Sequence, residues 1–318
     1  DLTMAEILAT IAEHVRGVIE QQRSKVPIDA LRDRPLFKAA PRGFARSLTG
    51  KARHIIAEIK KVSPSKGLIR ADFDPVWIAK TYAAHGAAAI SVLTEARFFQ
   101  GSLQHLEQVR AAVNLPLLRK DFILDPYQLV EAKSYGADAV LLIAALLEPR
   151  LILELREMAA ALSLDVLVEV HTRNELEAAV AAGAQLIGIN NRDLSTFEVS
   201  LSTTEHLAAL VPPNAVVVCE SGIDSIDAIR RVEKLGVHVF LIGESLMRAP
   251  DPGRYLAIDD GDEIVMLALR AGMTRIGRSS SADVAFDDGS VSRRHAAVMT
   301  RIDGGAEVLD DGSLNGTF

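Results

Sequence analysis

The chain has little of what secreted and membrane proteins usually carry. Its 318 residues include one cysteine, Cys219, which cannot form an internal disulfide and suits a reducing compartment. The longest apolar run, Ala139–Leu147, is far shorter than the ~20 residues of a membrane-spanning helix. No basic segment followed by an apolar stretch opens the sequence, so we expect no secretory signal. These absences predict a soluble, cytoplasmic protein.

Basic residues are also fewer than acidic ones. There are 35 Lys and Arg residues against 42 Asp and Glu residues, a formal net charge of −7. Nucleic-acid binders usually carry a basic face, so we expect no nucleic-acid partner and no membrane partner. A hydrophobic fraction of 49% excludes disorder as the main state. The length fits a large α/β domain followed by a small one, or two domains of medium size.

Short apolar runs alternate with segments of helical spacing over most of the chain. Eight such strands, each nearly continuously apolar, predict a parallel sheet buried on both faces. Eight βα units in about 200 residues fit a closed (β/α)8 TIM barrel better than an open sheet. The amphipathic segment Met4–Gln21 predicts an N-terminal helical extension. The predicted strands are 54–60, 87–95, 116–122, 137–145, 165–171, 186–191, 215–222 and 239–246, and predicted helices include 75–85, 103–113, 126–135, 150–162 and 174–182.

The pattern changes near Pro250. Lysine is absent from Gly253 onward, and short alternating runs punctuated by Asp, Gly and Ser replace the helical periods. This pattern predicts a small antiparallel all-β module, with strands at 264–270, 273–277, 283–286, 296–300 and 306–309. We therefore expect a barrel domain at residues 1–255 and a β domain at residues 256–318.

Polar residues end six of the eight predicted barrel strands. The side chains at the C-terminal ends of barrel strands converge on one mouth, where catalytic residues are found. Glu58 and Lys60 are two residues apart, so the strand sends both to the same side. Any single residue of this kind could form a structural ion pair at the rim, but six strands favour a catalytic site. The other strand-end residues are Lys120, Glu169, Asn190, Glu220 with Ser221, and Glu244.

Two glycines follow the last two strands. Gly222 and Gly243 leave backbone N–H groups open, and barrels frequently bind a phosphate between these two loops. The polar turn 63–67 after the first strand could wrap the same anion. A phosphorylated small-molecule substrate is the physical inference.

The order of these motifs resembles the indole-3-glycerol-phosphate synthase family across residues ~1–255, on every strand except the fourth. This resemblance implies a lyase that closes a ring on 1-(2-carboxyphenylamino)-1-deoxyribulose 5-phosphate and releases carbon dioxide and water, without a metal or organic cofactor. The general acid would be Lys120, the group that takes a proton back would be Glu169, and Lys60 would be a second cation. The matching segments are 56–67, 91–95, 99–102, 118–122, 168–171, 187–194, 220–223 and 241–247.

The resemblance also implies roles for supporting residues. Lys120 as a general acid would work best with a pKa lowered toward neutrality, by desolvation or by Lys60. The glutamates in the mouth should titrate together. Orienting groups would be Glu58, Asn190, Glu220 and Ser221; the phosphate clamp would be Ser63, Arg192, Gly222, Gly243 and the backbone at Glu244; the apolar slot for the anthranilate ring would be Phe99, Leu118, Phe122 and Leu194.

Other residues favour plain structural roles. His171 follows Glu169 by two positions, but a lone histidine is more often structural. Cys219 is expected to be a packed core thiol. The remaining histidines lack metal-ligand spacing, so no metal site is predicted. One departure from the family is a shortened last helix, with only Arg254–Ala257 before Asp and Gly intrude.

The C-terminal segments 274–279, 283–284, 291–295 and 311–318 resemble the forkhead-associated (FHA) domain, a phosphothreonine-reading β-sandwich. An arginine, a serine hydroxyl and loop amides suit a phosphate dianion. The segment 261–318 is far shorter than the ~100 residues of a typical two-sheet sandwich, so we expect an incomplete module. Truncation, an artificial fusion and completion by another chain remain open explanations. The resemblance implies phosphopeptide contacts from Arg278, Ser292, Arg293 and Asn315.

Two functions follow from these resemblances. The first is the lyase; the second is a phosphothreonine-peptide-binding protein that uses the barrel as a scaffold. The combination of Glu58, Lys60, Lys120 and Glu169 favours the lyase, since a scaffold need not keep acid, base and orienting groups together. This arrangement does not suit phosphoribosylanthranilate isomerase, another phosphate-binding barrel.

Overall fold

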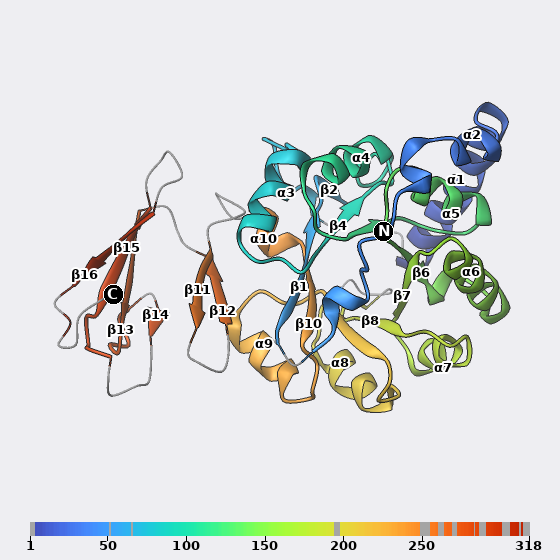
Figure 1. Cartoon of the computed structure of the whole chain (residues 1–318). Coiled ribbons are helices and arrows are strands. Elements are labelled where there is room, and N and C mark those ends of the chain that lie inside the picture. The colour runs from blue at the N-terminus through green and yellow to red at the C-terminus, as the bar shows by residue number, and fades with distance from the viewer. Residues whose placement is uncertain are drawn as a thin grey trace. The chain divides into compact units, whose positions relative to one another are not determined.

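The computed structural model describes residues 4–50, 52–64, 66–193, 198–248, 255–259, 264–268, 272–282, 284–285, 291–300, 306–311 and 313. The chain divides into two compact units, Asp1–Arg248 and Ala249–Phe318 (Figure 1). Two residues of the predicted sites, Leu194 and Asn315, lie outside the described residues.

The first unit is built on a closed barrel of eight parallel strands. Strand β1 pairs with β4 on one side and with β10 on the other, which closes the sheet. The interior is apolar, because buried parallel strands need apolar side chains on both faces. The predicted (β/α)8 TIM barrel is confirmed. The strands are β1 (His54–Ile59), β4 (Ala89–Leu93), β5 (Leu117–Lys120), β6 (Ala139–Ile143), β7 (Asp165–Val170), β8 (Leu186–Asn190), β9 (Val216–Glu220) and β10 (Val239–Ile242).

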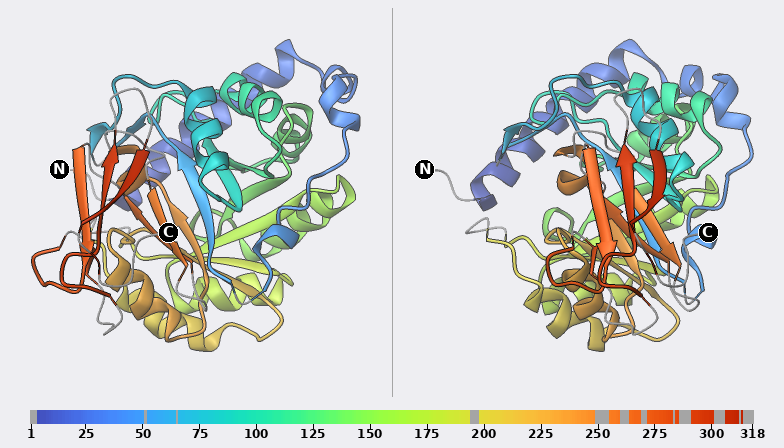
Figure 2. Two further views of the ribbon diagram at one scale, coloured as in Figure 1. Left: turned by 60° about the vertical axis from the view of Figure 1, so that its left-hand side comes forward. Right: turned by 90° about the vertical axis from the view of Figure 1, so that its left-hand side faces the viewer.

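Helices cover the outside of this barrel (Figure 2). Asp74 and Asp125 cap two of them by accepting hydrogen bonds from backbone N–H groups of the first turn, and proline follows each cap. The sequence analysis expected helices between all the strands but gave no bounds for the short helices α8 and α9. The helices are α3 (Pro75–Ala84), α4 (Leu103–Ala112), α5 (Pro126–Ser134), α6 (Pro149–Ala161), α7 (Arg173–Ala181), α8 (Ser202–Leu207) and α9 (Ile226–Glu233), with 3-10 turns η1 (Pro35–Lys38), η2 (Arg46–Leu48), η3 (Ala144–Leu146) and η4 (Ala208–Leu210).

An N-terminal extension precedes the barrel, as predicted. It consists of α1 (Met4–Lys25) and α2 (Ile28–Arg32). Buried side chains of α1, such as Ile11 and Val15, join the same hydrophobic cluster as the barrel residues. Arg23 near the end of α1 also forms an ion pair with Asp125. The extension is therefore part of the barrel's core and not a separate appendage.

The predicted last strand, 239–246, is too long. Strand β10 ends at Ile242, and helix α10 (Glu244–Arg248) begins after Gly243. Leu246 and Met247 are buried on this helix. An apolar run alone does not distinguish a strand from a buried helix, which explains the error. A short hairpin, β2 (Val62–Ser63) and β3 (Gly67–Leu68), follows β1.

The second unit is all β where the structure describes it, as predicted. Strands β11 (Tyr255–Asp259) and β12 (Ile264–Ala268) form an antiparallel pair. The residues expected to form the shortened last helix, 254–257, therefore fall largely in a strand. A four-stranded sheet has the order β14-β13-β15-β16 and buries Thr274, Ala296, Ala297 and Val298. Its strands are β13 (Gly272–Gly277), β14 (Val284–Ala285), β15 (Ala296–Thr300) and β16 (Ala306–Asp310).

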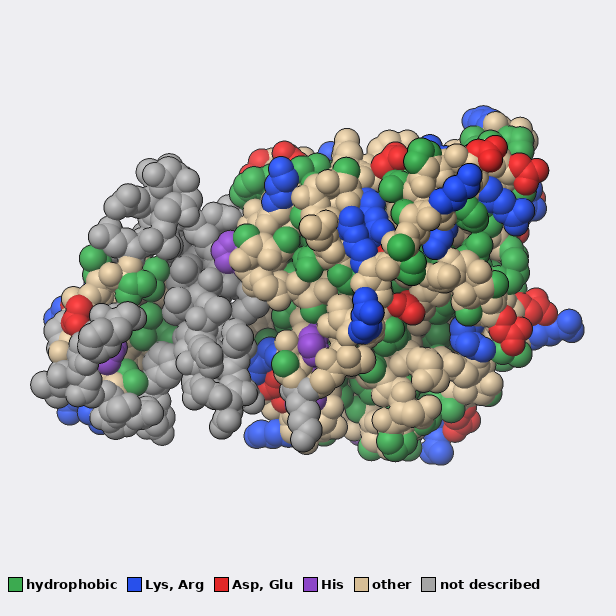
Figure 3. Space-filling model, viewed as in Figure 1, with side chains coloured by type: hydrophobic (Ala, Val, Ile, Leu, Met, Phe, Trp, Pro, Cys, Tyr) green, Lys and Arg blue, Asp and Glu red, His purple; other side chains and the backbone are tan. Residues whose placement is uncertain are grey.

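The surface of the barrel carries both signs of charge. On the face shown in Figure 3, basic and acidic side chains occur among apolar and neutral ones. Within the part of the chain that the structure describes, no helix has the length and apolar character needed to cross a membrane.

Candidate active site

The C-terminal ends of the barrel strands surround a cavity of about 760 Å³. Every described residue of the predicted catalytic and substrate sites lines it except Leu118. That side chain is fully buried in the hydrophobic core, one layer below the cavity. The predicted residues in the lining are Glu58, Lys60, Ser63, Phe99, Lys120, Phe122, Glu169, Asn190, Arg192, Glu220, Ser221, Gly222, Gly243 and Glu244.

Lys120 stands at the centre of the charged groups. Its Nζ lies 3.2 Å from Glu169 Oε2 and 3.3 Å from Glu220 Oε2. Burial alone would lower the pKa of Lys120, but the carboxylates of Glu220 and Glu169 outweigh burial and raise the pKa above its ordinary value. The expectation of a lowered pKa is therefore wrong for this structure, because carboxylates rather than a second cation face the ammonium group. Lys120 is charged at neutral pH.

Lys60 has a different partner. Its Nζ lies 2.6 Å from Glu58 Oε1, as expected for two side chains on the same side of one strand. Burial alone would raise the pKa of Glu58, but Lys60 and Lys120 lower it below its ordinary value. Glu58 thus remains ionised and links the two lysines electrostatically.

Glu169 is held by three groups. Its Oε2 faces Lys120, while Oε1 accepts a hydrogen bond of 3.2 Å from Asn190 Nδ2 and lies 3.4 Å from His171 Nε2. Burial opposes ionisation, but Lys120 and His171 lower the pKa of Glu169 well below its ordinary value. The carboxylate is therefore ionised and fixed in orientation.

His171 is the residue that sequence reasoning placed outside the site. Its Nδ1 lies 3.2 Å from Glu175 Oε2, and its backbone N–H donates to the same oxygen at 2.7 Å. Burial would lower the pKa of His171, but Glu169 and Glu175 raise it to about 9. The spacing of two from Glu169 was the available signal. The carboxylate of Glu175, four residues after His171 in the first turn of α7, was a second local signal.

Glu220 behaves differently from the other two glutamates. Burial, together with the neighbouring charge of Glu169, raises the pKa of Glu220 to about 8 even though Lys120 opposes the shift. Among the described residues, its Oε1 atom is buried without a hydrogen-bond partner. The carboxyl occupies space left open by Gly188, where a Cβ would collide with Oε1. Of the two carboxyls that face Lys120, Glu220 therefore holds a proton more tightly than Glu169 does.

The loops after β9 and β10 have backbone conformations suited to an anion. Ser221 and Gly222 have φ angles of 63° and 78°, in the left-handed region. Gly243 has no room for a side chain because a Cβ would collide with Glu58 Oε1. The Ser245 hydroxyl donates to Ile223 O at 2.9 Å and joins the two loops.

Apolar side chains form the other wall of the cavity. The rings of Phe99 and Phe122 lie 6.1 Å apart, centroid to centroid. Leu8 and Ile11 of α1 also line the cavity, which the sequence reading did not foresee. They lie 50 and 47 residues before Glu58, so the strand-end motifs gave no local signal for them.

Cys219 is fully buried next to the site. Asn191 Nδ2 lies 3.2 Å from its Sγ, and burial raises the pKa of the thiol. The side chain is a core thiol, as expected. No group of three or more His, Cys, Asp or Glu residues in the described parts of the chain could hold a metal ion.

In the second unit, three predicted phosphopeptide residues lie at adjoining loops. The backbone N–H of Arg278 donates to Ser292 O at 2.9 Å, and Arg278 Nε donates to Val291 O at 3.1 Å. Ser292 N–H donates to His295 Nδ1 at 3.2 Å. Arg293 is exposed, and its carbonyl packs where a Cβ on Gly277 would fall.

A closed (β/α)8 barrel with lysines and carboxylates clustered at its mouth defines an enzyme of the barrel class. Residues 8–257 match the family Indole-3-glycerol phosphate synthase, and residues 274–318 match the FHA domain. The chain belongs to the indole-3-glycerol phosphate synthase family and is a carboxy-lyase.

Named relatives agree with this assignment. Indole-3-glycerol phosphate synthase of Roseiflexus castenholzii is 49% identical over 259 residues, which cover 78% of this chain and 96% of the relative. The enzyme of the same name from Dehalococcoides mccartyi is 50% identical over 237 residues, covering 73% and 92% of the two chains. That of Albidiferax ferrireducens is 48% identical over 258 residues, covering 80% and 98%. These relatives match the barrel and support a place in tryptophan biosynthesis.

Proposed function

We propose that the mouth of the barrel converts 1-(2-carboxyphenylamino)-1-deoxyribulose 5-phosphate to indole-3-glycerol phosphate, with Lys120 as general acid and Glu169 as base. The observation that carries the proposal is the placement of the charged Lys120 between two carboxylates in the cavity. We place the catalytic domain at residues 1–255 and the FHA-like module at residues 256–318.

Ring closure joins an aromatic carbon to the carbonyl carbon of the sugar chain. The electron pair of the carbonyl moves onto its oxygen, and Lys120 Nζ gives that oxygen a proton. A buried ammonium stabilises the developing negative charge more than water could. Loss of the ring carboxylate as carbon dioxide then returns its bonding electrons to the ring.

Dehydration completes the reaction. The new hydroxyl takes a proton from the Lys60 ammonium and leaves as water, and Glu169 accepts the proton released from the adjacent carbon. Its low pKa and its contacts with Asn190 and His171 keep this carboxylate free of a proton and aimed into the cavity. Lys60, paired with Glu58, supplies a second positive charge for the substrate carboxylate or the departing hydroxyl.

The remaining residues bind the two ends of the substrate. Backbone N–H groups at the glycine-bearing loops suit the phosphate, and the two phenylalanines suit the aromatic ring. Orienting roles fall to Glu58, Asn190, Glu220 and Ser221; the phosphate group to Ser63, Arg192, Gly222, Gly243 and Glu244; the ring to Phe99 and Phe122, with Leu194 as a predicted contact. Leu118 does not line the cavity, so it is not assigned to the ring.

The test is turnover of the carboxyphenylamino substrate, followed by the fluorescence of the indole product. Lys120→Ala should reduce kcat by about 10²–10⁴-fold, the usual contribution of a general acid. Lys80→Ala is the matched control, because Lys80 is an exposed lysine of α3 that does not line the cavity. Equal turnover in the two variants would overturn the assignment of Lys120.

A second function is supported at the other unit. Arg278, Ser292 and Arg293 lie at adjoining loops, as the binding of a phosphothreonine would require. The test is titration of the full chain with a phosphothreonine peptide and with its unphosphorylated form. Binding of the phosphorylated peptide alone, lost in Arg278→Ala, would support this function; equal binding of both peptides would exclude it. Asn315 remains a predicted contact.

A further inference from the structure

A buried polar cluster stands behind the strand that carries Lys120. Lys120 faces the catalytic cavity, and the preceding residue, Arg119, faces the other way, toward α4 and α5. Arg119 is 3% exposed. Its guanidinium donates to Thr94 Oγ1 at 3.1 Å, to Asp121 Oδ2 at 3.0 Å and to the carbonyl of Gln128 at 3.0 Å, and it pairs with Glu131 Oε2 at 2.9 Å.

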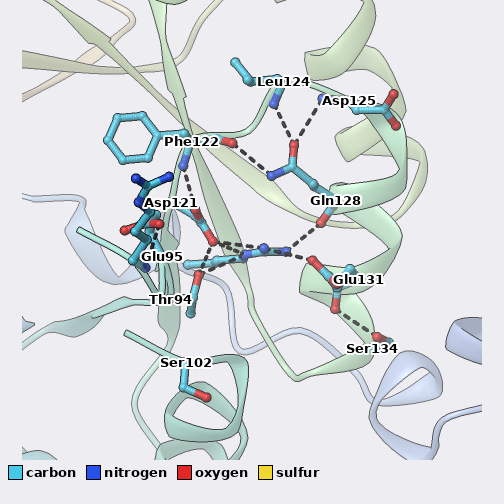
Figure 4. Close-up of polar contacts among 12 residues, drawn as sticks. Thr94, Glu95, Ser102, Asp121, Phe122, Leu124, Asp125, Gln128, Glu131 and Ser134 are labelled. Carbon is cyan, nitrogen blue, oxygen red and sulfur yellow. Dashed lines mark hydrogen bonds and ion pairs between the residues drawn. The ribbon is translucent and has the colours of Figure 1, made fainter. Parts of the chain in front are cut away.

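Figure 4 shows these groups converging from the ends of two strands and from one helix. Thr94 follows β4, Asp121 follows β5, and both Gln128 and Glu131 belong to α5. Burial lowers the pKa of Arg119, but Glu131 and Asp121 raise it above its ordinary value, so the side chain remains charged. The guanidinium of Arg119 thus links the end of β5 to the end of β4 and to α5.

The same cluster holds the backbone of the loop after β5. Asp121 Oδ1 accepts the N–H of Phe122 at 2.8 Å, and Gln128 Nε2 donates to the carbonyl of Phe122 at 2.9 Å. Gln128 Oε1 accepts the N–H groups of Leu124 at 2.7 Å and of Asp125 at 3.2 Å. Two side chains therefore make four hydrogen bonds to the backbone of the loop 121–125.

This loop reaches the active site at both of its ends. It begins directly after Lys120, and Phe122 lines the cavity beside Phe99. Fully satisfied buried polar networks fix a single geometry, because each alternative leaves a polar group unpaired. A displacement of about 1 Å at a reacting group can cost on the order of a hundredfold in rate.

We propose that Arg119 and Gln128 are positioning residues, which hold the loop 121–125 so that Phe122 and Lys120 meet the substrate in one fixed geometry. This inference rests on the proposed function of the cavity. Neither residue contacts the cavity, so neither would touch the substrate.

A second buried arginine supplies a matched control at the opposite end of the same strand. Arg110 Nη1 donates to Asp138 Oδ2 at 2.6 Å, and the N–H of Leu117, the first residue of β5, donates to the same oxygen at 2.9 Å. Arg110 is 8% exposed and Asp138 is 1% exposed. The pair fixes the start of β5, away from the cavity.

The test compares Arg119→Lys with Arg110→Lys below the unfolding temperature of both variants. Lysine keeps the charge but cannot reproduce the fork of guanidinium donors. Arg119→Lys should raise KM and lower kcat/KM by about tenfold, whereas Arg110→Lys should leave KM unchanged. Partial unfolding lowers kcat without changing KM, so the KM separates positioning from stability. An unchanged KM in Arg119→Lys, or an equal rise in both variants, would overturn the proposal.

A second pair of variants covers the case in which Arg119→Lys fails to fold. Gln128→Met removes the hydrogen bonds to the loop with an uncharged side chain of similar length and should also raise KM. Its control is Ser134→Ala on the same helix, because the Ser134 hydroxyl bonds only to the carbonyl of Glu131 among the described residues. An unchanged KM in Gln128→Met would overturn the role of Gln128.

Amide hydrogen exchange gives a readout that does not depend on turnover. The amides of Leu124 and Asp125, which donate to Gln128 Oε1, should exchange faster in Gln128→Met than in Ser134→Ala. Unchanged exchange would contradict the positioning role even if the wild type turned over no substrate. Absence of wild-type turnover with faster loop exchange would instead contradict the proposed function alone.

Discussion

At the C-terminal end of the barrel, Lys120 faces two carboxyls, and one carboxyl oxygen of Glu220 has no hydrogen-bond partner among the described residues. At the N-terminal end, Asp138 uses both oxygens: one accepts from Arg110 and Leu117, the other from the backbone N–H of Arg42. Similar buried charges are thus left incompletely paired at one end and fully paired at the other.

The C-terminal end of the barrel holds the groups proposed for the chemistry, and the paired charges at the N-terminal end stabilise the fold. Fully paired buried charges hold strands in place, while crowded carboxyls shift one another's pKa values and leave a group able to exchange a proton. This matches the general property of βα barrels, whose active sites lie at the C-terminal end of the strands. Replacing the same residue type at each end therefore provides the sharpest tests.

The largest expected effect comes from removing one carboxylate charge at each end. Glu169→Gln should lower kcat by about 10²–10⁴-fold even in its folded fraction, because the proton acceptor is lost. Asp138→Asn should lower the free energy of unfolding by about 3–5 kcal/mol, because Arg110 loses its charged partner. Steady-state kinetics and urea unfolding measure the two effects. Loss of activity by Asp138→Asn, at a temperature where it is folded, would contradict the difference between the two ends.

A smaller effect concerns the pH dependence of stability. The folded-state pKa of His171 is about 9, above the ordinary 6.5, so its contribution is complete below pH 6.5 and is lost as pH rises through 9. The lost contribution is on the order of 3 kcal/mol. His171→Asn should flatten this part of the stability profile in urea unfolding from pH 6 to 9.5. His206→Asn on α8 serves as the control and should keep the wild-type slope; equal slopes in wild type and His171→Asn would refute the pairing.

The smallest expected effect concerns the space around Glu220. Gly188→Ala should reduce the free energy of unfolding by about 1–3 kcal/mol and displace the Glu220 carboxyl, because the new Cβ meets that carboxyl. Gly17→Ala, in an open position of α1, should instead stabilise the protein by about 0.5–1 kcal/mol. Urea unfolding distinguishes the two. A Gly188→Ala variant as stable and active as the wild type would show that the Glu220 carboxyl is not confined there.

Features carried by local patterns were predictable from the sequence. Buried parallel strands are apolar runs, so all eight barrel strands and the polar residues at their ends could be found. The period of two placed Glu58 and Lys60 together, and the structure pairs them. The β module was also visible, because alternating runs between turn residues mark exposed strands. A cytoplasmic location stays a prediction.

Features that depend on contacts across the fold were not predictable. The predicted direction of the Lys120 pKa shift was wrong because its partners, Glu169 and Glu220, come from other strands. His171 was assigned a structural role even though its partners Glu169 and Glu175 lie only two and four residues away in the sequence. The apolar run at 239–246 continued through the start of α10, so sequence alone could not locate the end of the strand.

Removing one buried cation at each end of the barrel should separate chemistry from stability. The two variants are Lys120→Met at the mouth and Arg110→Met at the N-terminal end, and both turnover and urea unfolding are measured for each. Lys120→Met should lose about 10²–10⁴-fold in kcat even where it is fully folded. Arg110→Met should lose about 3–5 kcal/mol of stability while its folded fraction remains active. Full turnover by Lys120→Met, or loss of activity in folded Arg110→Met, would contradict this separation.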